Sequence, residues 1–103
     1  MFYLSLDVEA SGPFPGLFSL VSVGAVAVVC QGIWKLAEGS EFYVELKPLA
    51  GAGEMAEATA VHGLSCDYLS EHGLAPALAM ERFAAYYAGL EKRYGQAVGA
   101  AWP

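Results

Sequence analysis

The segment FYLSLDVEA, from Phe2 to Ala10, alternates along its whole length between apolar and mostly polar side chains. A period of two predicts a β-strand, because successive side chains of a strand point to opposite faces. Asp7 and Glu9 would then share one face, with their bases roughly 6.6 Å apart. We therefore expect an early strand that carries a pair of carboxylates on its polar face.

Two further strands are expected after the Gly- and Pro-rich loop at residues 11–16. Residues 20–29 form a nearly unbroken apolar run, which is typical of strands buried on both faces in α/β proteins. A turn follows, residues 33–36 are a candidate continuation, and residues 41–46 alternate again. The predicted arrangement is a three-stranded meander that forms a mixed or antiparallel sheet.

Helices are expected in the second half of the chain. Residues 54–62 are rich in Ala and Glu and predict a short helix that ends at Gly63. Ser65 is a candidate N-cap for another short helical turn that ends near Gly73. The clearest helix is Pro76–Tyr94, because Pro suits a first turn and Lys and Arg suit a last turn.

This long helix carries one apolar stripe at steps of three and four residues, and such stripes usually face a sheet. The predicted stripe consists of Met80, Phe83, Tyr87, Leu90 and Tyr94. After Gly95 the sequence looks cut at the point where the next strand should begin. The fold class predicted for the chain is therefore α/β, with a meander and helices packed on its sheet, in an incomplete domain.

Composition limits the class of protein. The chain has 103 residues, of which 56% are hydrophobic and 16% charged, so it can fill one small core. With a net charge of −6, electrostatics alone would repel a nucleic acid from the whole surface. This excess of acidic residues argues against a sequence-reading DNA-binding module. Any binding of nucleic acid must be confined to a local site that recruits cations.

The two cysteines, Cys30 and Cys66, have neither Cys-x-x-Cys nor zinc-type spacing. We expect ordinary buried thiols in a reducing compartment. No signal-peptide pattern opens the chain, and the apolar stretch at residues 17–30 is shorter than the roughly 20 residues of a membrane helix. The expectation is a cytoplasmic protein without a membrane segment; the sequence does not indicate an oligomeric state.

The carboxylate pair is the strongest chemical signal. At an effective dielectric constant of 20, two negative charges 6.6 Å apart repel by about 2.5 kcal/mol. A divalent cation offsets this repulsion, and carboxylate oxygens suit Mg²⁺ or Mn²⁺. The alternative is that Asp7 and Glu9 are solvent-exposed acids without a ligand. A sugar-cleaving carboxylate pair fits less well, because glycosidase carboxylates flank a bond from two sides.

Several motifs together resemble the opening of the DEDD-type, DnaQ-like 3′–5′ exonucleases, which have a ribonuclease H-like fold. They are LDVEASG at residues 6–12, LVSVGAVAV at residues 20–28, Lys47-Pro48 after the third strand, VHGL at residues 61–64, and the Phe-containing helix. The resemblance covers nearly all of this chain but only about the first half of the family's domain.

The resemblance implies that Asp7 and Glu9 are catalytic metal ligands, with Asp7 bridging two Mg²⁺ or Mn²⁺ ions and Glu9 binding one of them. The activity implied is hydrolysis of phosphodiester bonds at the 3′ end of single-stranded DNA or RNA. In the family, a second and a third motif complete the site. Residues 1–103 are therefore expected to be the N-terminal part of one exonuclease domain and inactive alone. The alternative is a non-catalytic, truncated or decayed ribonuclease H-like domain.

Weaker candidates surround the pair. Ser11 and Gly12 could offer backbone N–H groups to the terminal nucleotide, or could form a plain tight turn. Phe14 and Phe18 could stack on a base, although such residues more often anchor a loop.

His62 and Asp67 have the His-x-x-x-x-Asp spacing of the family's third motif. Their place in the chain matches the His-Gly-Leu connector instead. His62 is therefore interpreted as a helix-terminal residue beside Gly63 and not as a catalytic base.

Overall fold

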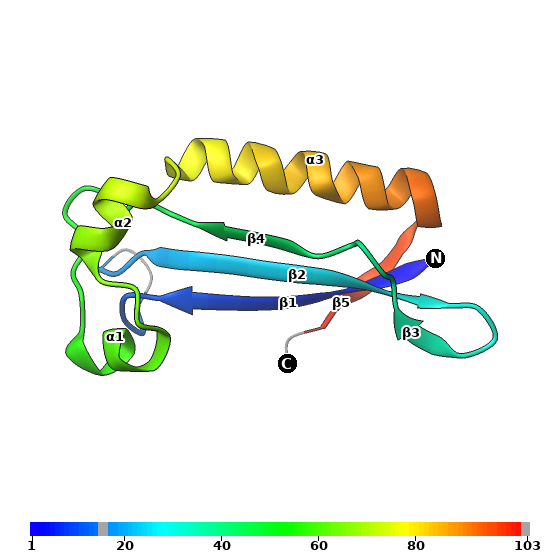
Figure 1. Cartoon of the computed structure of the whole chain (residues 1–103), viewed down its shortest axis with the longest axis horizontal. Coiled ribbons are helices and arrows are strands. Elements are labelled where there is room, and N and C mark those ends of the chain that lie inside the picture. The colour runs from blue at the N-terminus through cyan, green and yellow to red at the C-terminus, as the bar shows by residue number, and fades with distance from the viewer. Residues whose placement is uncertain (15–16, 102–103) are drawn as a thin grey trace.

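The computed structural model describes residues 1–14 and 17–101. Within these residues four strands come first, then three helices and a fifth strand, in the α/β class expected from the sequence (Figure 1). In chain order they are β1 (Phe2–Ala10), β2 (Leu20–Cys30), β3 (Trp34–Leu36), β4 (Phe42–Glu45), α1 (Ala56–His62), α2 (Cys66–His72), α3 (Pro76–Tyr94) and β5 (Ala97–Ala101).

The sheet contains the predicted meander. β1 pairs antiparallel with β2, and β2 pairs antiparallel with both β3 and β4. The third strand of the meander is thus interrupted between Leu36 and Phe42, and its two parts share one edge of β2. β5 lies on the other side of β1 and runs parallel to it, which makes the sheet mixed.

The strand β5 corrects the expectation that the next strand lies outside the chain. Its residues are Ala, Val, Gly, Ala and Ala, which neither alternate in polarity nor favour a strand strongly. The pairing with β1 is parallel and follows a crossover through α3. Pairing with the open edge of β1, rather than the strand propensity of these residues, therefore accounts for the formation of β5.

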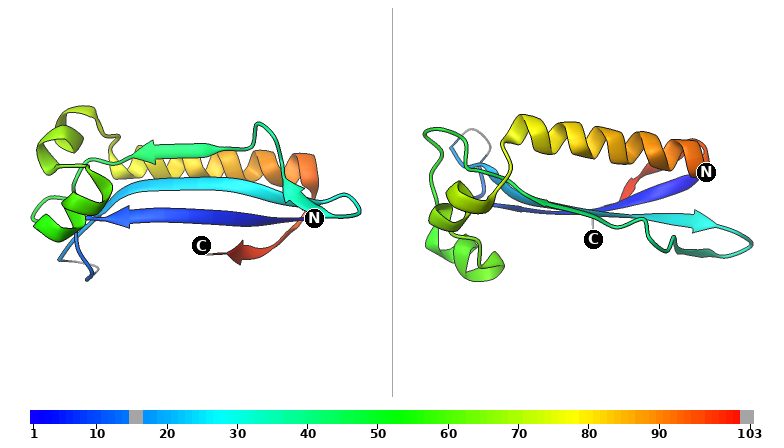
Figure 2. Two further views of the ribbon diagram at one scale, coloured as in Figure 1. Left: turned by 60° about the horizontal axis from the view of Figure 1, so that its bottom comes forward. Right: turned by 45° about the horizontal axis from the view of Figure 1, so that its top comes forward.

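The helix α3 runs along one face of the sheet (Figure 2). On that face Phe2, Leu4 and Ala27 form one core cluster with Leu90 of α3, and aromatic side chains of α3 pack around them. Further along the helix, Ala79 packs in a second cluster with strand residues of β2 and β4. The burial of these side chains from water supplies the main force that holds α3 on the sheet.

The predicted stripe of α3 needs one correction. Phe83, Tyr87, Leu90 and Tyr94 do pack against the sheet, but Met80 is 44% exposed. Ala79 occupies the corresponding inward position and is fully buried. The helix is therefore rotated slightly from the setting that the large side chains alone suggest.

The short helices lie at the end of the sheet where β1 and β4 terminate (Figure 1). α1 begins at Ala56, two residues later than predicted, and Gly63 ends it in the left-handed conformation with φ of 72°. Ser65 caps α2 by accepting a hydrogen bond from the Tyr68 N–H at 3.2 Å. Both predicted helix boundaries at Gly63 and Ser65 are confirmed.

Gly73 ends α2 and is buried against the chain that follows β4. A Cβ atom at Gly73 would lie 2.6 Å from backbone atoms of Leu46 and Lys47, so a side chain cannot fit there. Backbone hydrogen bonds flank this close approach, from Leu74 N–H to the Glu45 carbonyl and from Lys47 N–H to the Leu74 carbonyl. They fix α2 next to the end of β4.

The face of the sheet opposite α3 carries several exposed side chains, namely Tyr3, Trp34, Leu36 and Tyr43. Tyr3 and Trp34 contact each other, with ring centroids 5.0 Å apart. Both cysteines are free thiols in the described part of the chain, and Cys30 is exposed, contrary to the expected burial. Among the described helices, none is long and apolar enough to cross a membrane.

Candidate active site

Asp7 and Glu9 lie on the same face of β1, as the alternation predicted. β1 pairs with β2 in regular register from Phe2 to Glu9, and the first irregularity comes after Glu9. The two carboxylates point away from α3, since the alternate positions Phe2 and Leu4 are in the core. Asp7 is exposed and Glu9 is half-buried.

The register places two further polar side chains, both of β4, on this face. Asp7 lies opposite Gly24, which lies opposite Tyr43. Glu9 lies opposite Ser22, which in turn lies opposite Glu45. Sequence reasoning missed Tyr43 and Glu45. The alternation of residues 41–46 was the available signal, but the strand register was needed to bring them beside the pair.

Two tyrosine hydroxyls donate hydrogen bonds to the Glu45 carboxylate. Tyr43 donates to Oε2 at 2.7 Å, and Tyr68 of α2 donates to Oε1 at 2.8 Å. Burial, followed by the hydrogen bond and charge of Glu45, raises the pKa of Tyr43 to about 12. The hydrogen bond from Tyr68 to Glu45 raises the pKa of Tyr68 as well. Both phenols are therefore protonated donors near neutral pH.

The donor chemistry of Asp7 and Glu9 fits a hard divalent cation, because both offer carboxylate oxygens. Within residues 1–14 and 17–101, no group of three or more His, Cys, Asp or Glu side chains could hold a metal ion. The pair can thus supply two ligands of an ion, and most of the coordination sphere must come from water or from other groups.

Ser11 is a buried hydrogen-bonding centre of the loop that follows β1. Its N–H donates to the Ser19 carbonyl at 2.9 Å, and its carbonyl accepts from Met55 N–H at 2.8 Å. Its hydroxyl donates to the Gly53 carbonyl at 2.7 Å and accepts from the Ser19 N–H at 3.0 Å. No donor of Ser11 is left for a nucleotide, which argues against the predicted substrate contact through its backbone.

Gly12 has a packing role. A Cβ atom at Gly12 would overlap the ring of Phe18, so the aromatic side chain occupies the space above this glycine. Phe18 is half-buried and also lies near Gly53, whereas Phe14 is 62% exposed. Phe18 therefore anchors the loop, and Phe14 is the more accessible of the two aromatic side chains.

His62 and Asp67 lie in the corner between α1 and α2. His62 Nδ1 accepts a hydrogen bond from Leu64 N–H at 2.9 Å, and its buried Nε2 has no partner among the described residues. Asp67 is exposed in the first turn of α2. These positions agree with the interpretation of His62 as a residue of the connector between two helices. They give no support to a third catalytic motif formed by His62 and Asp67.

Glu54, which was expected inside the first short helix, precedes α1 and binds both short helices. Its Oε1 accepts from the Thr59 hydroxyl at 2.9 Å and from the Cys66 N–H at 3.0 Å. The hydrogen bond from Thr59, followed by that from Cys66, lowers the pKa of Glu54. Glu54 therefore stabilises the corner beside the candidate site.

The fold is shared with solved exonuclease structures. Cell-death related nuclease 4 (CRN-4) superposes with a TM-score of 0.68 at 17% identity, over 86% of this chain and 30% of that protein. Escherichia coli exonuclease I in complex with a dT13 oligonucleotide superposes with a TM-score of 0.70 at 17% identity, over 84% of this chain and 18% of that protein. The chain therefore has a ribonuclease H-like fold that corresponds to part of these larger proteins.

The sequence comparison agrees with the structural one. The 3′-5′ DNA exonuclease Cap18 of Escherichia coli is 36% identical over 81 residues, which are 79% of this chain and 39% of Cap18. No protein-family model matches the chain. The chain is similar in sequence to this 3′–5′ DNA exonuclease and spans about two fifths of its length.

Proposed function

We propose that residues 1–103 are the N-terminal part of a metal-dependent 3′–5′ exonuclease domain that acts on the 3′ ends of single-stranded nucleic acid. The observation that carries this proposal is the position of Asp7 and Glu9 on one sheet face, in a chain that is 36% identical to Cap18 over 81 residues. The names of Cap18 and of the exonuclease I complexes favour DNA over RNA as the substrate.

In this proposal Asp7 and Glu9 hold divalent ions, for which Mg²⁺ and Mn²⁺ are the suitable chemical class. When bound, such ions supply positive charge for activating water and for stabilising the leaving 3′ oxygen. The residues of this chain contribute two negative charges and a rigid strand that holds both carboxylates at a constant separation. The open sheet face provides access for a phosphate.

The 103-residue chain is proposed to be inactive alone. Two divalent ions carry four positive charges, and Asp7 and Glu9 offset only two. Among the described residues no third metal-binding side chain joins the pair. A second candidate function, a non-catalytic ribonuclease H-like domain, is favoured by the same incomplete ligand set.

The two candidates differ in a nuclease assay. The 103-residue chain and the longest reading frame that contains it would each be incubated with a 5′-labelled single-stranded DNA and Mg²⁺. The exonuclease proposal expects a ladder shortened from the 3′ end with the longer form, sensitive to EDTA and lost in its Asp7→Asn variant. The matched control is Glu57→Gln, which removes an exposed acid of α1.

Inactivity of a folded longer form would overturn the exonuclease proposal in favour of the non-catalytic one. Robust, EDTA-sensitive cleavage by the 103-residue form would show that the active site is already complete within it.

A further inference from the structure

We propose that Tyr43 is a stacking residue for a nucleobase of the single-stranded substrate, and that Glu45 and Tyr68 hold its ring in position. This inference rests on the proposed function, since it takes Asp7 and Glu9 as the place where the substrate phosphate is bound. It assigns a binding role to Tyr43 and positioning roles to Glu45 and Tyr68.

The ring of Tyr43 lies across the sheet from Asp7 with only Gly24 between them. A Cβ atom at Gly24 would lie 3.8 Å from Cδ1 of Tyr43 and 3.7 Å from the Asp7 carbonyl oxygen. The ring therefore leans over the backbone of Gly24. Because Gly24 has no side chain, no side chain projects from β2 between the Asp7 carboxylate and the Tyr43 ring.

The distance across this surface suits one nucleotide. Asp7 and Tyr43 are two strand spacings apart, roughly 9.6 Å between their Cα atoms. A phosphate near Asp7 and Glu9 therefore leaves room for the attached sugar and base to extend across Gly24. The base would then meet the ring of Tyr43.

The ring of Tyr43 is exposed and yet held in place. Its side chain is 60% exposed, and its hydroxyl is tied to Glu45 at 2.7 Å. A ring that is already fixed loses less conformational entropy when a ligand binds than a free one does. An accessible, oriented aromatic ring is what a stacking platform requires.

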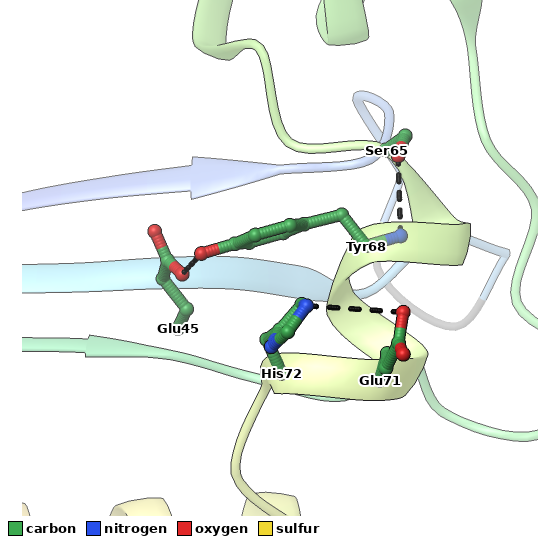
Figure 3. A network of polar contacts seen from close by, with 5 residues as sticks. All are labelled: Glu45, Ser65, Tyr68, Glu71 and His72. Atoms are coloured by element: carbon green, nitrogen blue, oxygen red, sulfur yellow. Dashed lines mark hydrogen bonds and ion pairs between the residues drawn. The ribbon is translucent and has the colours of Figure 1, made fainter.

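Glu45 is itself held from the other side. Tyr68 projects from α2 toward the sheet, and its hydroxyl reaches Glu45 (Figure 3). The ring of Tyr68 contacts that of His72, with centroids 4.9 Å apart, and Ser65 caps the turn from which Tyr68 extends. Both oxygens of Glu45 thus accept tyrosine hydrogen bonds, which favours an anchoring role over metal binding.

Stacking also agrees with the charge of the chain. A net charge of −6 gives little general attraction for a phosphate backbone. Base stacking depends on the faces of the rings and not on net charge. The Tyr43 phenol is neutral at physiological pH, since its pKa of about 12 lies even further above that pH than the ordinary value of 10, so its ring adds no repulsive charge.

The test uses the 103-residue chain with Mg²⁺ and a short single-stranded DNA that carries 2-aminopurine near its 3′ end. Emission of 2-aminopurine falls when the base stacks on an aromatic ring. Wild type should quench the emission, and Tyr43→Ala should abolish quenching and weaken binding about tenfold. An otherwise identical DNA with an abasic site should bind wild type and Tyr43→Ala equally.

The controls separate stacking from folding. Tyr43→Phe keeps the ring but loses the bond to Glu45, so quenching should persist with reduced affinity, and Glu45→Gln should behave in the same way. Tyr3→Ala, which removes another exposed tyrosine of this face, should leave quenching unchanged. If circular dichroism shows that Tyr43→Ala is unfolded, Tyr43→Leu replaces it as an apolar variant without an aromatic ring.

The outcomes distinguish this inference from the proposed function. Unchanged quenching by folded Tyr43→Ala or Tyr43→Leu overturns the stacking role, as does a lack of DNA binding by folded wild type. If quenching requires Tyr43 but DNA affinity is the same with and without Mg²⁺ and is unchanged in Asp7→Asn, the stacking role stands and the metal site fails. If binding requires Mg²⁺ and Asp7 but not Tyr43, the metal site stands and the stacking role fails.

Discussion

Glu9 and Glu45 lie on one face of the sheet, directly on either side of Ser22. They belong to β1 and β4, which are separated in the chain but share β2 as a neighbour. We propose that Glu9 binds metal, whereas the Glu45 carboxylate accepts hydrogen bonds from two tyrosine hydroxyls. Two carboxylates in one cross-strand row thus have different surroundings, so we expect substitutions of Glu9 and of Glu45 to have different effects.

The first prediction concerns metal binding. The 103-residue chain should bind Mn²⁺ weakly, because two carboxylates leave most of the coordination sphere to water. Asp7→Asn should abolish this binding, and Glu45→Gln should leave it unchanged because its oxygens already accept hydrogen bonds. Relaxation of water protons by Mn²⁺ measures the bound fraction. Equal binding by wild type and the Asp7→Asn, Glu9→Gln double variant would refute the assignment.

The second prediction concerns tyrosine ionisation. Of the six tyrosines, Tyr43 and Tyr86 should ionise near pH 12, because burial is the first cause of the raised pKa in both. Glu45→Gln should lower the pKa of Tyr43 toward its ordinary value of 10, although not fully, and leave that of Tyr86 unchanged. Ultraviolet absorbance of phenolate follows the titration. An unaltered titration curve in Glu45→Gln would contradict the hydrogen bond.

The same shifts set a pH dependence of stability. The folded chain favours the neutral phenols, so this contribution is fully present below pH 10 and is lost as the pH rises through about 12. The free energy of unfolding should therefore fall in that alkaline window. Tyr43→Phe, which cannot ionise, should show a smaller fall than wild type when urea unfolding is measured at pH 9 and at about pH 11.5.

The third prediction tests which face of α3 packs on the sheet. Leu90→Ala should reduce the free energy of unfolding by about 2–5 kcal/mol, because Leu90 is buried in the core. Met80→Ala should cost much less, since Met80 is 44% exposed and Ala suits a helix well. Urea denaturation of both variants provides the comparison. Similar losses for the two would mean that the helix is rotated toward Met80.

The fourth prediction concerns Ser11. Ser11→Ala should reduce the free energy of unfolding by about 1–3 kcal/mol, because it leaves the Gly53 carbonyl and the Ser19 N–H without their side-chain partner. Ser70→Ala, at an exposed position of α2, is the matched control. Chemical denaturation measures both. A Ser11→Ala variant as stable as wild type would contradict the anchoring role of the Ser11 hydroxyl.

Local chemistry made much of the fold readable from the sequence. The alternation in Phe2–Ala10 determined that Asp7 and Glu9 share a face, because the side-chain period of a strand is fixed. Gly63 and Ser65 marked helix ends through left-handed backbone and side-chain capping, both of which depend on neighbouring residues only.

Only the tertiary structure decided the remaining features, because each depends on residues that are distant in the chain. The strand β5 forms against the open edge of β1 despite a weak local signal. Ala79, not Met80, faces the sheet because the packing of all of α3 sets the rotation of the helix. Tyr43, Glu45 and Tyr68 meet because register and helix placement bring β4 and α2 together. Sequence periodicity specifies the face of a side chain, whereas its neighbours across the sheet depend on pairing, which the whole fold determines.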